Sequence, residues 1–365
     1  MPIRLTKGVL IRTIALISLL VATFLIQLGL ENSSSFLHFY IKNIFSPLQH
    51  CRSFVFNKLP FSFGDILYLL LALLLLLMVM RTIYFLFTIK KNATDLQVEI
   101  LRLLLMPVIV YFLFVLLWGG NYARPSLSQD LITTDLPWDN DALISLNKEL
   151  VQKMNQEQQK PIQYSNLNNI NHYANTLYHQ HYGNKIAQLK VKPTSLGYLL
   201  NYIGIQGYYN PLSGEGQFNR FIPLFMHPFV ISHEMAHQTG IAAEDDANLA
   251  AYVIGSESTI PEFRYSAYFN IFLYAYSDLK EKDSLAAKNV YSMLNQQSKN
   301  DIDTLKAMNR KYRSKFRKFT NNLYDEYLKL HGQKEGIATY SDVTRWVYFR
   351  EHSTQKKADL PICPW

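Results

Sequence analysis

The chain has 365 residues, 49% of which are hydrophobic, yet its mean hydropathy is only -0.03. The apolar residues must therefore be concentrated in one part of the chain and balanced by a polar remainder. This distribution excludes a protein whose whole chain faces water or whose whole chain faces lipid. The net charge of +8 would suit nucleic acid, but many basic residues flank apolar runs, where membrane topology explains them, so nucleic acid is not expected as a partner.

Three apolar runs occupy the first third of the sequence, at about residues 13–30, 61–89 and 103–120. Each reaches the roughly 17 to 25 residues that a helix needs to cross the hydrocarbon core of a bilayer. Three such runs in close succession favour membrane spans over buried core helices, and the first run is long for the apolar part of a signal peptide. The sequence therefore predicts a membrane anchor over residues 1–122 with three transmembrane helices.

The basic residues beside the spans predict the orientation of this anchor. On the side of the N-terminus they are Arg4, Lys7, Arg12, Arg81, Lys90, Lys91 and Arg102, and on the other side they are fewer, namely Lys42, Arg52, Lys58 and Arg124. This bias favours a cytoplasmic N-terminus. We therefore expect a multi-pass protein of the cytoplasmic (inner) membrane whose polar part lies on the extracytoplasmic (periplasmic) side, where Cys51 and Cys363 could form one disulfide.

Residues 123–365 have mixed polar patterns that predict a water-soluble domain. Periodicity predicts helices over residues 139–157 and 166–182, and residues 202–209 and 214–222 resemble short strands. Helices return after Pro228, with a charged amphipathic stretch over 278–330 and a last helix over 341–350. The expected fold is mainly α, with three N-terminal transmembrane helices followed by an α+β domain that has a small sheet.

The segment H-E-M-A-H, residues 233–237, carries the chemistry of this domain. Residues four apart on a helix lie on one face, so His233 and His237 can bind the same ion with Glu234 beside them. Gly240 suits the end of that helix, and the acidic residues 244–246 open a second helix that can bring one carboxylate back to the ion. A catalytic zinc takes three protein ligands and keeps one position open, and two His with one Glu is such a set.

Two resemblances narrow this prediction. The element Glu244-x-x-Ala247-Asn248 resembles the one by which gluzincin peptidases supply their glutamate ligand, which implies that Glu244 is the third ligand of zinc (Zn2+), with Asp245 and Asp246 in reserve. The third histidine of metzincins would fall at Ala243, so that class is excluded. Asn248 stands where many gluzincins have Asp, and we expect its amide oxygen to accept a hydrogen bond from a ligand imidazole.

The wider sequence is similar to the bacterial membrane family catalogued as domain of unknown function 3810. The similarity covers nearly the whole chain and implies a zincin-like metallopeptidase domain. It rests on the three spans, on the H-E-M-A-H segment and on three further segments, which are Trp118-Gly119-Gly120-Asn121-Tyr122, Gly207-Tyr208-Tyr209-Asn210-Pro211 followed by Ser213-Gly214-Glu215, and Phe263-Arg264-Tyr265-Ser266.

The expected reaction is zinc-assisted hydrolysis of a bond in a peptide or protein substrate, with Glu234 as the general base that later returns a proton to the leaving amine. Tyr265 and Arg264 are candidates, by resemblance and chemistry, to stabilise the oxyanion, although a buried phenol and a surface ion pair explain them equally well. The extended stretch Tyr208 to Asn219 either binds substrate backbone or forms a turn. Glu215 within it is either an anchor for a substrate amine or a surface charge.

Other functions stay open at this point. The domain could be a catalytically inactive zincin-like membrane receptor or scaffold, or a zinc hydrolase of a cell-envelope amide. A structural zinc prefers four protein ligands and has no use for Glu234, which argues against the scaffold. Membrane lipid is the other expected partner, because the basic stretch from Lys306 to Lys318 could rest on anionic headgroups, or could simply be a solvated helix face.

Overall fold

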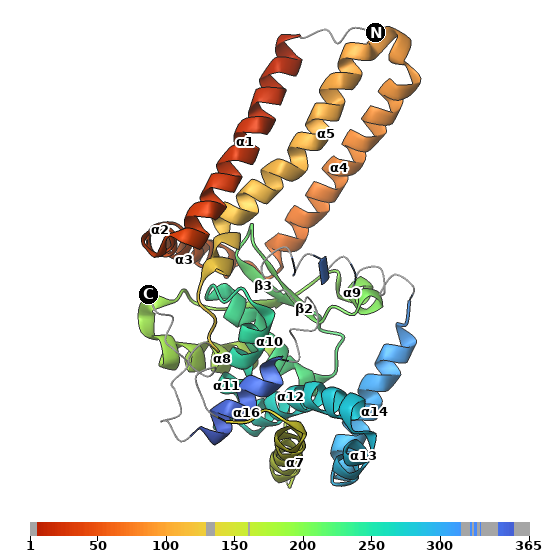
Figure 1. Ribbon diagram of the computed structural model, residues 1–365. Helices are drawn as coiled ribbons and strands as arrows, with labels where there is room; N and C mark the ends of the chain where they lie inside the picture. The colour runs from red at the N-terminus through yellow and green to blue at the C-terminus, as the bar shows by residue number, and fades with distance from the viewer. Residues whose placement is uncertain are drawn as a thin grey trace. The chain divides into compact units, whose positions relative to one another are not determined.

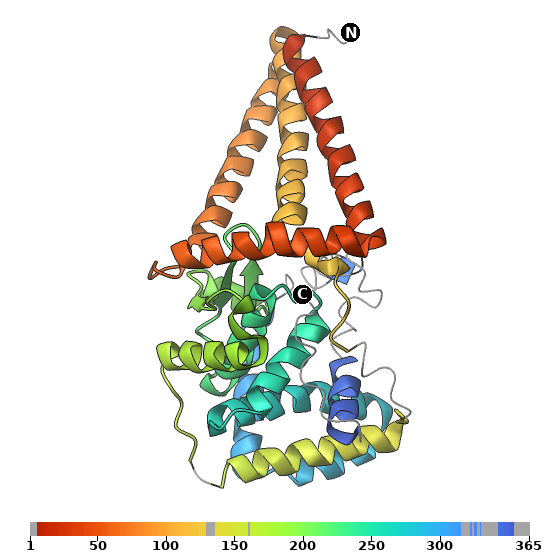
Figure 2. The same ribbon diagram turned by 90° about the vertical axis from the view of Figure 1, so that its left-hand side faces the viewer.

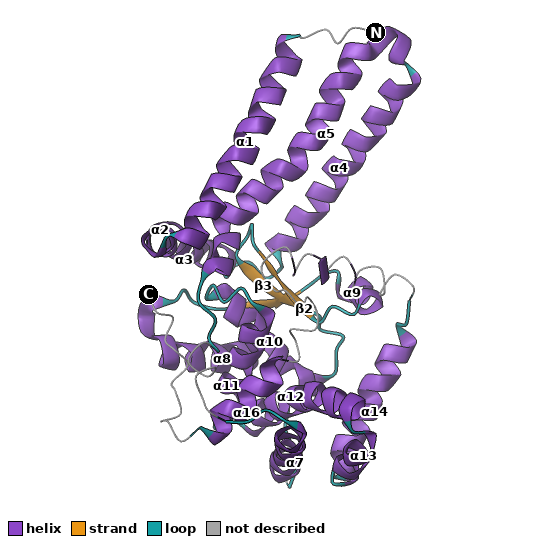
Figure 3. Ribbon diagram, viewed as in Figure 1, coloured by secondary structure: helices purple, strands orange, loops and turns teal. Residues whose placement is uncertain are grey.

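The computed structural model describes residues 6–128, 136–159, 161–314 and 342–353, together with residues 322, 325, 326 and 329. The chain forms two compact units. The membrane unit comprises Met1–Leu48, Phe63–Ala123 and Pro211–Ser213, and the polar unit comprises Gln49–Ser62, Arg124–Asn210 and Gly214–Trp365. Helices dominate both, and one small sheet lies in the polar unit (Figure 3), which confirms the mainly α fold with three N-terminal membrane helices.

The membrane unit is built from long apolar helices (Figures 1 and 2). Three stretches among the described residues are long and apolar enough to cross a membrane, namely Lys7–Asn32, Phe63–Phe87 and Ala93–Leu117, so this is a membrane protein. The helix that contains the third span packs against the helices of the other two. The elements of this part of the chain are α1 (Lys7–Asn32), α2 (Ser34–Tyr40), the π-helix η1 (Ile41–Phe45), α3 (Ser46–Phe56), α4 (Phe63–Phe87), α5 (Ile89–Leu117) and the 3-10 helix η2 (Gly119–Ala123).

Arg81, which interrupts the second apolar run, has an acidic partner. Its Nε lies 3.1 Å from Glu99 Oε1 of α5, and Arg102 lies 2.5 Å from the same oxygen. An ionisable group in a membrane helix is costly unless it is paired, so Glu99 makes Arg81 tolerable at the end of a span.

The polar unit is a helical domain around one sheet. Its helices bury apolar residues at helical spacing, as α7 does with Leu143, Leu146 and Leu150. α12 packs against α7, α10 and α11. The elements are α7 (Asn140–Glu157), α8 (Leu167–Tyr182), η3 (Gly183–Lys185), β1 (Val191–Pro193), α9 (Gly197–Ile203), β2 (Gly207–Asn210), β3 (Glu215–Phe218), η4 (Leu224–Met226), α10 (His227–Gln238), α11 (Glu244–Ser256), α12 (Pro261–Lys282), α13 (Ser284–Ser292), α14 (Gln296–Lys311) and α16 (Asp342–His352).

The predicted helices over 139–157 and 166–182 match α7 and α8, but the predicted strands were too long. Residues 202–203 end α9, and the paired strands cover only Gly207–Asn210 and Glu215–Phe218. The sheet has the order β1-β3-β2, with β1 parallel and β2 antiparallel to the central β3. The strand β1 was not predicted, because a three-residue strand has no alternating pattern to detect. Of the basic stretch, Lys315, Arg317 and Lys318 lie outside the described residues, as does Cys363.

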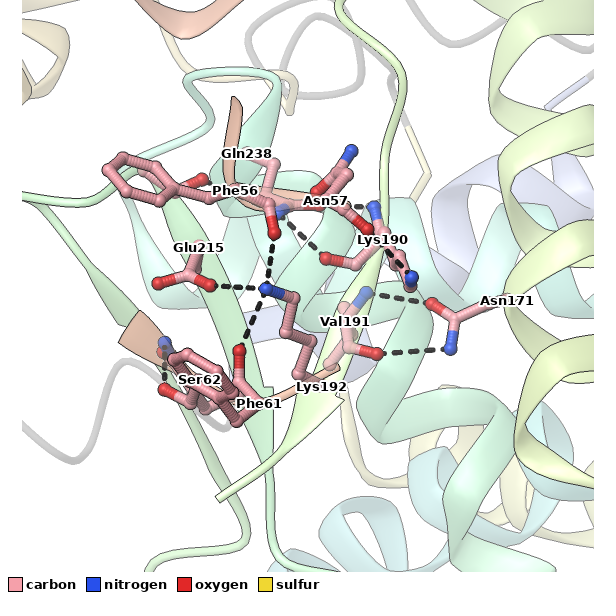
Figure 4. A network of polar contacts seen from close by, with 12 residues as sticks. Phe56, Asn57, Phe61, Ser62, Asn171, Lys190, Val191, Lys192, Glu215 and Gln238 are labelled. Atoms are coloured by element: carbon pink, nitrogen blue, oxygen red, sulfur yellow. Dashed lines mark hydrogen bonds and ion pairs between the residues drawn. The ribbon is translucent and has the colours of Figure 1, made fainter. Parts of the chain in front are cut away.

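Residues 49–62, which we call the strap, belong to the polar unit although they lie between two membrane helices in sequence. Gln49 Nε2 donates to Gly214 O at 2.8 Å, and Asn57 Nδ2 donates to Gln188 O at 2.8 Å. Figure 4 shows the centre of this network, where Lys192 Nζ donates to Phe56 O, to Phe61 O and to Glu215 Oε1. The division of the sequence near residue 122 therefore leaves out a segment that the polar domain contains.

Lys192 and Glu215 form a buried ion pair with an Nζ to Oε1 distance of 2.7 Å, and each is only about 2% exposed. Glu215 is thus neither a surface charge nor a free anchor for substrate. Lys192→Met is expected to lower the free energy of unfolding of the polar unit by about 3 to 5 kcal/mol, because the carboxylate would stay buried without its cation. Pulse proteolysis of the full chain in urea measures this loss.

Lys306→Met is the matched control, because Lys306 forms an exposed pair with Asp303 at 3.1 Å. A pair of this kind contributes less than about 1 kcal/mol. Equal unfolding midpoints for the two variants would show that the Lys192 network does not hold the strap.

Candidate metal centre

The helix α10 presents two imidazoles from a buried position. It begins with Pro228 in its first turn, where the missing N–H costs nothing, and it packs against all three strands. Tyr178 of α8 donates its hydroxyl to Ser232 O at 2.6 Å, and Phe229 N donates to Ser266 Oγ at 3.1 Å. These contacts fix the register and the rotation of the helix that carries His233 and His237.

The chain turns sharply after α10 and returns along α11. Gly240 has a φ of 92°, a left-handed conformation that glycine adopts without strain, and Ile241 N donates to Ala236 O at 3.2 Å. Gln238 exchanges two hydrogen bonds with the backbone of Lys190, which lies beside the strap network (Figure 4). The turn brings Glu244, the first residue of α11, back to the histidines.

The side chains of His233, His237 and Glu244 converge. The Nε2 atoms of the two histidines are 3.1 Å apart, and Glu244 oxygens lie 3.1 Å from His233 Nε2 and 3.7 Å from His237 Nε2. Ligand atoms at about 2.0 to 2.1 Å from a tetrahedral zinc are roughly 3.3 Å apart, so these separations fit that ion. Within the described ranges, this is the one group of three or more His, Cys, Asp or Glu side chains with ligand atoms close enough to share a metal.

Hydrogen bonding and charge prepare the ligands. His237 Nδ1 donates to Ile241 O at 2.7 Å, which leaves Nε2 directed at the centre. Burial would lower the pKa of His237, but Glu244, Glu234 and the Ile241 carbonyl together raise it to about 9, so a bound metal would displace a proton from this imidazole. Burial would raise the pKa of Glu244, but the two histidines hold it well below its usual range. The Glu244 side chain is therefore an anion at neutral pH, as a zinc ligand must be.

Asn248 lies beside His233, where the sequence places it. Burial lowers the pKa of His233, and the Glu244 carboxylate and the Asn248 amide oppose this effect, although His233 Nδ1 makes no hydrogen bond with the described residues. An outer amide of this kind orients a ligand imidazole.

Glu234 lies at the centre without belonging to the ligand group. It is 3% exposed, and its Oε2 is buried and makes no hydrogen bond with the described residues. A Cβ atom on Gly207, the first residue of β2, would clash with Glu234 Oε1, so glycine leaves room for this carboxylate in its present position. Burial raises the pKa of Glu234 to about 8, although His237 opposes the shift. An unpaired carboxylate beside a metal-binding group suits a general base.

Asp246, one of the two alternative candidates for the third ligand, makes hydrogen bonds elsewhere. Asp246 is buried, and its Oδ1 accepts hydrogen bonds from Ser126 Oγ at 2.7 Å and from Leu127 N at 3.0 Å. Asp246 therefore anchors the segment that follows the last membrane helix in sequence. Neither it nor Asp245 belongs to the group that could share a metal.

Arg264 and Tyr265 are engaged with other helices. Arg264 forms two hydrogen bonds of 2.6 Å with Glu157 of α7, and its third nitrogen donates to Ser258 O. Tyr265 is fully buried and donates its hydroxyl to Asp301 Oδ2 of α14 at 2.5 Å. These contacts correspond to the structural alternatives, the ion pair and the buried phenol, and they give no support to a catalytic role for either residue.

Tyr274 is a polar residue of the centre that the sequence did not single out. Burial raises its pKa and the Glu244 carboxylate raises it further, while the Asn248 amide opposes the shift. Tyr274 lies nine residues after Tyr265 on α12, which is about half a turn of rotation, so the two phenols leave opposite sides of the helix. One side faces Asp301 and the other faces Glu244.

The predicted extended stretch forms the hairpin β2-β3, which lies against α10. β2 ends the sheet and pairs, within the described part of the chain, with β3 alone. Its first residue is Gly207, next to Glu234, so the outer edge of β2 starts at the centre.

Comparison with known proteins gives one match. A family model described as "Protein of unknown function (DUF3810)" matches residues 40–348, which include the metal-binding group and the second and third membrane spans. No curated protein matches the chain, and no solved structure matches it.

Proposed function

The chain belongs to this family of unknown function, and because the family description names no activity, we propose from the chain's own residues that it is a membrane-anchored zinc metallopeptidase. One observation carries the proposal. His233, His237 and Glu244 form a three-ligand group with zinc-compatible spacing, and Glu234 lies beside it, buried and with an oxygen that makes no hydrogen bond with the described residues. Three protein ligands and an adjacent base are typical of a hydrolytic zinc site, whereas a structural site uses four ligands.

His233, His237 and Glu244 would hold the metal. Bound zinc supplies a Lewis acid that lowers the pKa of a water molecule to about 7 and polarises a carbonyl group. Glu234 takes the proton from the attacking water and returns it to the leaving amine. The absence of a hydrogen-bond partner for Glu234 Oε2 in the described chain supports this role, because a carboxylate tied to another donor would first have to release it.

Tyr274 is the candidate donor to the oxygen on which negative charge develops. The Tyr274 side chain is half-buried, and its phenol is close enough to Glu244 for that carboxylate to raise its pKa, whereas Tyr265 donates to Asp301 on another helix. β2 is an edge strand of the described sheet and begins at Gly207 beside Glu234, so an extended peptide that pairs with this strand would reach the centre. The substrate class is thus a peptide or protein segment in extended conformation.

The decisive experiment compares peptide hydrolysis and zinc content between the full chain and its Glu234→Gln variant. The full chain is needed because the strap belongs to the polar unit.

The proposal places the polar unit on the periplasmic side of the inner membrane, because basic residues are more frequent beside the spans on the side of the N-terminus. A reporter that is active only in the cytoplasm should stay silent when it is fused to the C-terminus. The same reporter inserted after Lys91, between the second and third spans, should be active. An active C-terminal fusion together with a silent fusion at Lys91 would reverse the orientation and give the metal centre cytoplasmic substrates.

A further inference from the structure

The polar unit carries a cluster of exposed apolar side chains around α9 and the turn after β3. We call this cluster the α9 patch, and its largest members are Tyr198, Leu199, Ile205, Phe221 and Leu224. Leu199 is 63% exposed and Leu224 is 55% exposed. Scattered apolar residues on a surface need no explanation, but a contiguous cluster marks an interaction site.

Aromatic contacts join the parts of the patch into one surface. The ring of Tyr198 lies 6.5 Å from that of Phe221 and 5.9 Å from that of Tyr312, and Tyr202 lies 5.2 Å from Tyr312. Ser314 Oγ donates to Tyr202 O at 2.7 Å. The patch therefore includes the end of α14 as well as α9 (Figure 1).

The rim of the patch is basic. The Arg220 guanidinium lies 5.1 Å from the centre of the Phe221 ring, and Lys311 Nζ lies 5.2 Å from that of Tyr312. Arg313 is also exposed. From residue 194 to residue 225 the acidic side chain is Glu215 alone, and it is buried against Lys192. Tyrosine and other apolar side chains beside basic groups suit the headgroup region of a bilayer with anionic lipid.

Chain connectivity puts this surface within reach of a membrane. The strap ends at Ser62, whose Oγ lies 3.0 Å from the Gln217 amide of β3, and the apolar helix α4 begins at the next residue. Lys192 of β1 holds Phe61 O of the strap at 3.0 Å. Phe221 is four residues after Gln217, so the two lie no more than about 14 Å apart. Gln217 is the residue that is hydrogen-bonded to Ser62, directly before α4.

The strap has the same surface chemistry. It exposes Phe54, Val55 and Phe61, and Lys58 Nζ lies 3.6 Å from the centre of the Phe54 ring. The strap, which directly precedes α4, and the α9 patch, which includes Phe221 four residues after Gln217, thus both expose apolar side chains with basic neighbours.

We infer that the α9 patch rests on the headgroup region of the bilayer, with Arg220, Lys311 and Arg313 against anionic lipid. The occupant is the membrane rather than a second protein, because the basic rim matches lipid phosphate and because Ser62, the residue before the membrane helix α4, is hydrogen-bonded to Gln217 of β3. The surface is independent of the proposed hydrolytic activity. The patch is close to the metal centre along the chain, since Ile205 is two residues from Gly207, which lies against Glu234.

Fluorescence quenching in proteoliposomes tests this contact. The full chain, with Cys51 and Cys363 replaced by Ser, receives a single cysteine at Leu224 or Leu199, labelled with an environment-sensitive dye. Lipids that carry a nitroxide near the headgroup should quench both positions. Leu285 is the matched control, because it is 69% exposed in the same unit and lies on α13, outside the patch. Its label should stay unquenched and in water.

Two further measurements distinguish contact with the membrane from contact with a second copy of the chain. Neutralising Arg220, Lys311 and Arg313 by substitution with Gln should reduce quenching at Leu224 in vesicles that contain anionic lipid and have little effect in neutral vesicles. Quenching at Leu224 no stronger than at Leu285 would overturn the inference. So would a label that becomes shielded only as protein density in the membrane rises, because that result would assign the patch to a second copy of the chain.

Discussion

Glu234→Gln is expected to lower the rate of peptide hydrolysis by at least about 10²- to 10⁴-fold while zinc stays bound. Glu234 neighbours the metal-binding group without being part of it, so the amide removes the base and leaves the three ligands in place. Gln has nearly the same volume as Glu, and the space beside Gly207 accepts it. Rates measured on a peptide library with zinc-loaded wild type and variant give the ratio directly.

Glu262→Gln is the matched control, because Glu262 is a buried glutamate of the same unit that lies outside the centre and accepts a hydrogen bond from Ser165 N at 2.7 Å. It should hydrolyse peptides at the wild-type rate. Equal rates for wild type and Glu234→Gln would remove the general base from the mechanism.

Replacement of any one ligand by Ala should release the zinc. His233, His237 and Glu244 act on one ion, so a missing ligand opens the site to water and exchange. Loss of a hydrogen-bond partner of a metal ligand typically lowers metal affinity by about 10- to 100-fold, and loss of a ligand itself should lower zinc affinity by more. Hydrolysis should disappear together with the zinc. Zinc per chain, measured after dialysis against a competing chelator, reports the effect.

Asp245→Ala and Asp246→Asn test the choice among the three acidic residues. Asp246 holds Ser126 and Leu127, and Asn keeps an oxygen that can accept from both, so zinc should remain. If Asp246→Asn loses its zinc while Glu244→Ala keeps it, the third ligand is Asp246 and not Glu244.

Local sequence predicts well those elements that have a regular hydrophobic periodicity or a markedly apolar composition. The membrane spans follow from apolar runs of sufficient length, and α7 and α8 follow from helical periodicity. The pairing of His233 with His237 is equally local, because one turn of helix places both on the same face. Glu244 is different, since the first turn of α11 offers three adjacent carboxylates. The resemblance to the gluzincin element pointed to Glu244 as the third ligand. Asp246 is not available as a ligand, because it packs against residues 126–128.

The features that sequence did not predict depend on contacts between distant segments. The strap contacts residues more than 120 positions away, and β1 is a strand only because β3 lies beside it. Tyr265 and Tyr274 lie on the same helix, and no local pattern tells which phenol faces the metal-binding group. Only the helices packed on either side decide that Tyr265 meets Asp301 and that Tyr274 meets Glu244.

Removal and return of zinc tests the central claim most directly. The full chain, reconstituted in lipid, is treated with a chelator, and hydrolysis of a peptide library is followed as zinc is added back. The account predicts that hydrolysis is lost with the metal and returns in full at one zinc per chain. Hydrolysis that survives complete loss of zinc, or an absence of hydrolysis in a chain that holds one zinc at His233, His237 and Glu244, would contradict it, and the second result would favour a receptor or scaffold.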